Sequence, residues 1–163
     1  MKIFLEPYET EAAIQVGTKR YLMRLDSGDR AYYDRSRMEH DLHANIAACV
    51  AEIAVAKHLN QYWGNHWWVT TGHKLYESMA DVGYDVEVRR IREPRNPLAI
   101  RDKDALNNRT VYAVYVRTPE YTEADIIGSI SAKAGWEIGS RPEWDKSNET
   151  RVVSLDQLNR LDT

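Results

Sequence analysis

The stretch from Asp81 to Arg89, DVGYDVEVR, constrains the fold of this chain most strongly. Its second half alternates between valine and charged residues, which is typical of a β-strand with one apolar face. The two valines share that face, whereas Glu87 and Arg89 share the other, about 7 Å apart along the strand. Asp81 precedes the strand, before Gly83, where the chain can bend. One strand is therefore expected to bring two acids and a cation into a small volume.

This acid–x–base pattern has two interpretations. Carboxylates are the ligands that Mg²⁺ prefers, and a neighbouring cation would stabilise the negative charge that grows on a phosphate during hydrolysis. The alternative is that charges on an exposed strand face only improve solubility and form weak cross-strand pairs. The pattern alone does not decide between these interpretations.

Hydrophobic periodicity predicts helices over residues 10–25 and 40–59, followed by several strands. The expected strands are Tyr84–Ile91, Leu98–Arg101, Thr110–Arg117 and Asp125–Ser131. Ser131 can cap a short helix, and Ser154 begins a capping-box pattern for a final helix. The order of elements predicts one α/β domain with a mixed or antiparallel-rich sheet.

Glu52 lies on the second predicted helix among small and apolar neighbours. It is therefore not expected on the most solvated side of that helix. A half-buried carboxylate needs a partner, which could be a metal ion or the side chain of an arginine or lysine.

Charge and composition limit the classes of function. The net charge of −3 does not by itself favour a nucleic-acid-binding protein. The run from Arg89 to Lys103 is nevertheless basic, and it could meet a phosphate backbone or simply be a solvated surface. No apolar run is long enough to span a membrane, no signal peptide is recognised, and the single Cys49 argues for a reducing compartment. We therefore expect a cytoplasmic protein.

Three short motifs in a fixed order resemble the PD-(D/E)XK nuclease superfamily. They are Ala51–Leu59 (AEIAVAKHL), Ala80–Gly83 (ADVG) and Val86–Arg89 (VEVR). More narrowly, the chain is similar to small phage and prophage proteins in which a helical Gly/Ala-x-Glu-x-Ala motif precedes Asp-Val-Gly and a Glu-Val-Arg or Glu-Val-Lys strand. The similarity covers nearly the whole chain, and the order and spacing of the motifs carry it.

The resemblance implies a restriction-endonuclease-like core, a mixed central β-sheet flanked by helices. It implies a single domain over residues 1–163, with an N-terminal helix at 10–26, a core at 40–136 and a C-terminal extension at 137–163. It makes Asp81 and Glu87 ligands of Mg²⁺ or Mn²⁺, and Glu52 the helical acid that completes the metal site. Arg89 falls where the family has a lysine that helps to activate water.

Arginine stays charged but does not easily lose a proton. Either Arg89 acts electrostatically, or another cation such as Lys74 or Arg90 replaces the lysine, or the site is inactive. The expected activity is metal-dependent hydrolysis of DNA by a phage-encoded endonuclease in the host cytoplasm. The alternative is an inactive nuclease-fold accessory protein that binds DNA or a protein, or is virion-associated.

Contacts with DNA are expected from four arginines, Arg35, Arg37, Arg90 and Arg92. Three tryptophans, Trp63, Trp67 and Trp68, could stack on bases, although such a cluster more often forms a core or a homodimer surface.

Overall fold

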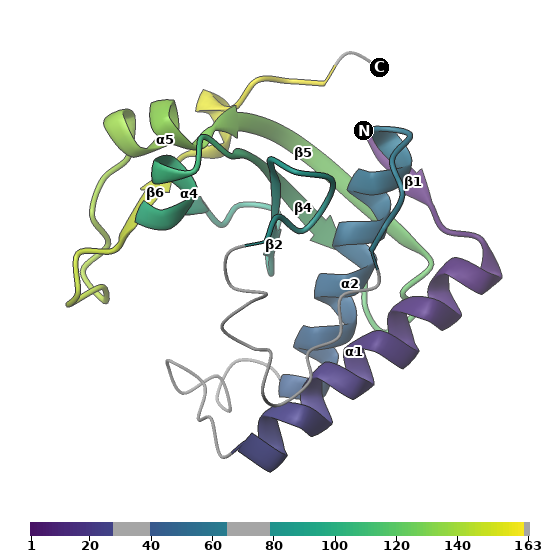
Figure 1. Ribbon diagram of the computed structural model, residues 1–163. Coiled ribbons are helices and arrows are strands. Elements are labelled where there is room, and N and C mark those ends of the chain that lie inside the picture. Colours follow the sequence, from purple (N-terminus) through teal and green to yellow (C-terminus); the bar gives the residue numbers. More distant parts are fainter. Residues whose placement is uncertain (28–39, 65–78, 162–163) are drawn as a thin grey trace.

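The computed structural model describes residues 1–27, 40–64 and 79–161 (Figure 1). These residues form a four-stranded mixed sheet with helices on both faces and a second, two-stranded sheet. The elements are β1 (Lys2–Phe4), α1 (Pro7–Ser27), α2 (Asp41–His58), β2 (Val86–Ile91), β3 (Leu98–Arg101), α4 (Asp102–Leu106), β4 (Thr110–Val116), β5 (Glu123–Ser131), α5 (Ala132–Ile138), β6 (Thr150–Val153) and the 3-10 turn η1 (Leu155–Gln157).

The predicted α/β class and mixed sheet are confirmed. Both long helices and all four predicted strands are present, with ends shifted by a few residues. The final helix expected after Ser154 is only a short 3-10 turn. Sequence analysis missed β1, α4 and β6, which have five residues or fewer and are too short to show a period.

The main sheet has the strand order β1-β5-β4-β2. Strand β2 runs parallel to β4, with Glu87 opposite Val111 and Arg89 opposite Ala113, whereas β5 is antiparallel to both β4 and β1. Within the described residues, β2 is the last strand on its side of the sheet.

Two apolar cores lie on opposite faces of the main sheet. The first joins α2 to the sheet and includes Val50, Val88 and Ile126. The second lies toward β3 and β6 and includes Val111 and Val153. Each fully buried aliphatic side chain contributes about 1.5–3 kcal/mol to stability. Because β6 supplies part of the second core, the C-terminal segment belongs to the folded unit.

Helix α1 lies along α2, which in turn covers the sheet (Figure 1). Gly17 permits this close approach, because a Cβ at this position would lie 2.6 Å from the Cα of Ile46. Almost every residue of α2 from Ala44 to Ala56 is buried as a result. The close contact also brings Arg20, one turn after Gly17, toward Glu52 on α2.

Candidate functional site

Glu52 is held by two donors in the interior. Its Oε1 accepts a hydrogen bond of 2.6 Å from Nη1 of Arg20, and its Oε2 accepts bonds of 2.9 Å from Nη2 of Arg20 and from Nε1 of Trp63. The side chains of Glu52 and Arg20 are each 7 % exposed. The arginine expected as one possible partner of Glu52 is Arg20. Trp63 is a core residue, in agreement with the structural interpretation of the tryptophans, whereas Trp67 and Trp68 lie outside the described residues.

Arg20 and Glu52 form a buried ion pair. Burial alone would lower the pKa of Arg20, but the Glu52 carboxylate, with smaller contributions from Cys49 and Asp81, raises it above its ordinary value. Arg20 therefore stays charged in the interior. Removal of either partner would leave a buried charge without compensation.

Asp81 lies beside the edge of β2. Its Oδ2 accepts a hydrogen bond of 2.8 Å from the backbone N–H of Val88. The turn between Asp81 and β2 contains Gly83 at φ +59°, a conformation that favours glycine, and a Cβ there would collide with the side chain of Gln61. Asp81 is thus fixed to the same strand that carries Glu87 and Arg89.

Arg89 joins several carboxylates. Its Nη1 lies 2.9 Å from Oε2 of Glu87 and 3.8 Å from Oδ2 of Asp81. Its Nη2 donates a hydrogen bond of 2.6 Å to Oδ2 of Asp104, whose side chain is only 1 % exposed. On the other side of Glu87, Nε of Arg109 lies 3.9 Å from Oε1.

The pKa values of Asp81 and Arg89 are both raised. Burial, and then the charges of Glu52 and Glu87, raise the pKa of Asp81 well above its usual range. The Asp81 side chain is 29 % exposed, so it keeps partial contact with water. Burial would lower the pKa of Arg89, but Asp104, Glu87 and Asp81, in that order, raise it.

The ion pairs of the cluster join four carboxylates, Glu52, Asp81, Glu87 and Asp104, to three guanidinium groups, those of Arg20, Arg89 and Arg109. Fully ionised, this set carries one excess negative charge. Burial and the nearby charges of Glu52 and Glu87 raise the pKa of Asp81 within this set.

A divalent ion fits only part of the predicted ligand set. Within the described ranges, no three His, Cys, Asp or Glu side chains are arranged to hold a metal ion by themselves. Mg²⁺, however, often binds through one or two carboxylates and keeps several waters. Asp81 and Glu87 are the candidates for this mode. Oδ2 of Asp81 and Oε2 of Glu87 face the same nitrogen of Arg89, so an ion would use the other carboxylate oxygens, and Oδ1 of Asp81 accepts no hydrogen bond from the described residues. Both oxygens of Glu52 are already engaged.

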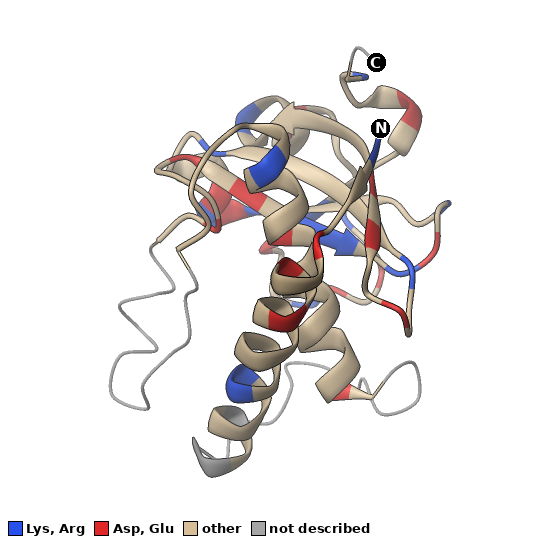
Figure 2. Ribbon diagram, turned by 90° about the vertical axis from the view of Figure 1, so that its right-hand side faces the viewer, with Lys and Arg blue, Asp and Glu red and all other residues tan. Residues whose placement is uncertain are grey.

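Two of the four predicted DNA-contacting arginines, Arg90 and Arg92, lie within the described residues. Arg35 and Arg37 lie outside the described residues. Arg90 is half-buried and, by strand alternation, faces away from Arg89, while the half-buried Arg92 follows β2. Acidic and basic positions are interspersed over the ribbon (Figure 2). DNA binding therefore stays a prediction.

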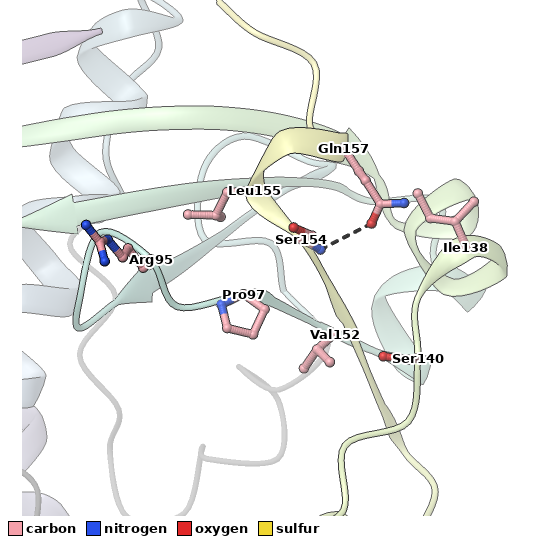
Figure 3. Close-up of a pocket in the computed structure, with 8 residues that line it drawn as sticks. All are labelled: Arg95, Pro97, Ile138, Ser140, Val152, Ser154, Leu155 and Gln157. Atoms are coloured by element: carbon pink, nitrogen blue, oxygen red, sulfur yellow. Dashed lines mark hydrogen bonds between the residues drawn. The ribbon is translucent and has the colours of Figure 1, made fainter.

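A shallow pocket of about 330 Å³ lies elsewhere, between η1, β6 and the loop after β2 (Figure 3). Arg95, Val152 and Leu155 are among the residues that line it, and none of the clustered carboxylates does so. The pocket is therefore separate from the candidate site.

Sequence analysis identified four members of the cluster and missed Arg20, Asp104 and Arg109 as their partners. The spacing of Gly17 and Arg20 on one helix was an available signal, because a glycine allows a long neighbouring side chain to reach the next helix. Asp104 had no comparable signal, since α4 has only five residues.

Comparison with protein-family models, with curated proteins and with solved structures finds no match to this chain. Among the described residues, no helix is both long and apolar enough to cross a membrane.

Proposed function

We propose that the protein is a Mg²⁺- or Mn²⁺-dependent phosphodiesterase that acts on DNA. One observation carries the proposal: the carboxylates of Asp81 and Glu87 lie together at the edge of β2, beside the guanidinium of Arg89. Hard oxygen ligands beside a permanent positive charge are what phosphodiester hydrolysis requires. The mixed sheet between helices also supports a restriction-endonuclease-like core, which the resemblance implies.

In this proposal, Asp81 and Glu87 hold the ion. The bound ion would polarise the scissile phosphate and lower the pKa of a coordinated water. Arg89 remains protonated at every relevant pH, so it stabilises charge on the phosphate and does not accept the proton of the attacking water. Glu52 acts on Asp81 through its charge and fixes α1 against α2 through Arg20.

The test is cleavage of linear, nicked, branched and single-stranded DNA by the purified protein in Mn²⁺ and in chelator. We expect metal-dependent cutting that Glu87→Ala and Asp81→Asn abolish. Asp85→Asn is the matched control, because Asp85 is an exposed acid just before the same strand. Cutting that survives Glu87→Ala would show that the active site lies elsewhere.

The second candidate is a catalytically inactive nuclease-fold protein that binds DNA or a protein partner. It is favoured by Arg89, which already bonds to Glu87 and Asp104 and could replace a metal ion as the counter-charge. If this candidate is right, the protein should cut no DNA, and calorimetry should detect no binding of Mn²⁺. A micromolar Mn²⁺ site that Asp81→Asn removes would count against it.

A further inference from the structure

Arg89 falls where the family that the chain resembles has a lysine. The two terminal nitrogens of its guanidinium each donate to a different carboxylate. Nη1 bonds to Glu87 at 2.9 Å, while Nη2 bonds to Asp104 at 2.6 Å. A lysine ammonium is a compact point charge on a flexible stem and has no second, separately directed nitrogen. Arginine at this position is therefore matched to two acceptors, of which Asp104 is the more deeply buried.

Asp104 is itself fixed in place. Its side chain is 1 % exposed, and the same Oδ2 that accepts from Arg89 also accepts a hydrogen bond of 3.1 Å from the backbone N–H of Arg101 at the start of α4. The backbone carbonyl of Asp104 accepts a further bond of 3.0 Å from the N–H of Arg109. Movement of this carboxylate would take an acceptor from two partly buried donors, the guanidinium of Arg89 and the N–H of Arg101.

We infer that Asp104 is the positioning residue of the site, which holds the guanidinium of Arg89 against Glu87 and so lets arginine stand where the resembled family has lysine. Asp104 acts through Arg89 and is not assigned contact with the substrate. We call the contact of Asp104 with Arg89 the clamp. Its existence is independent of the proposed function, whereas its effect on cleavage rests on that function.

The clamp is tested by nitrogen-15 NMR of the arginine side chains. In the wild-type protein we expect slow rotation of the Arg89 guanidinium and separate signals for its Nη protons, assigned by their loss in Arg89→Lys. Asp104→Asn keeps an acceptor for the Arg101 N–H but removes the charge, so the signals should average. Asp102→Asn, in the same helical turn, is the control and should keep them separate. Separate signals in Asp104→Asn would overturn the inference.

The effect on function is tested by steady-state cleavage in Mn²⁺, after circular dichroism confirms that each variant is folded. We expect Asp104→Asn to lower kcat by about 10- to 100-fold with little change in KM, because a misplaced charge weakens the transition state more than the ground state. Arg89→Lys should show a similar loss, and the Arg89→Lys/Asp104→Asn double variant should be no worse than Arg89→Lys.

Losses that multiply in the double variant would mean that Asp104 does not act through Arg89. If Asp104→Asn does not fold, Asp104→Glu, which keeps the charge but displaces it, replaces it in the same comparison. If the wild-type protein cuts no DNA, the proposed function and the catalytic part of this inference fail together, while the NMR result still decides whether the clamp exists.

Discussion

The pair formed by Arg20 and Glu52 makes the sharpest prediction about stability. Replacing Arg20 by methionine keeps a long side chain but leaves Glu52, 7 % exposed, with Trp63 as its remaining donor among the contacts described. Breaking a buried pair in this way costs about 3–5 kcal/mol. A domain of this size is stable by about 5–15 kcal/mol, so the loss is large, and the Tm should fall by about 2–4 °C for each kcal/mol.

The assay is urea unfolding followed by circular dichroism in metal-free buffer. Lys57→Met is the matched control, because Lys57 forms a 2.8 Å pair with Glu9 but its side chain is 37 % exposed, and such surface pairs contribute about 0–1 kcal/mol. The double variant Arg20→Met/Glu52→Gln should recover much of the loss, since no buried charge remains. The reasoning is refuted if Arg20→Met lowers the free energy of unfolding no more than Lys57→Met does. It is also refuted if the loss in the double variant equals the sum of the losses in Arg20→Met and Glu52→Gln measured separately.

Two further predictions concern packing and pH. Gly17→Ala should lower the free energy of unfolding by about 1–3 kcal/mol, because the added Cβ would lie 2.6 Å from the Cα of Ile46 and push α1 away from α2. The control in the same urea assay is Gln15→Ala, because Gln15 is exposed on the same helix. The raised pKa of Asp81 means that the folded protein holds this proton more tightly than the unfolded chain does, so stability in chelator should fall as pH rises from the ordinary aspartate pKa through the raised one. Asp81→Asn should flatten that fall, and a wild-type pH slope in this variant would contradict the assignment.

The faces of β2 were predictable from sequence because alternation is a local property. Val86 and Val88 pack in the core that includes α2, and Glu87 and Arg89 point to the opposite face, as the period of two requires. The burial of Glu52 was likewise predictable, because its helical neighbours are small and apolar. Each of these inferences needed only residues within a few positions of one another.

The partners of the acids could not be predicted in the same way. Arg20 on α1 contacts Glu52 on α2, and that contact depends on how closely the two helices approach each other at Gly17. Asp104 contacts Arg89 from α4, an element that is too short to show a period in the sequence. Long-range packing, which no local pattern encodes, decides which charge neutralises which.

The most direct test of the central claim is a crystal structure of the protein with Mn²⁺, with the ion located by its anomalous scattering. The account predicts a peak at ligand distance from the carboxylates of Asp81 and Glu87, through the oxygens that do not face Arg89, and none at Glu52, whose oxygens are held by Arg20 and Trp63. The peak should be absent from crystals of Asp81→Asn. A fully occupied Mn²⁺ site elsewhere, or none at Asp81 and Glu87 at saturating Mn²⁺, would contradict it.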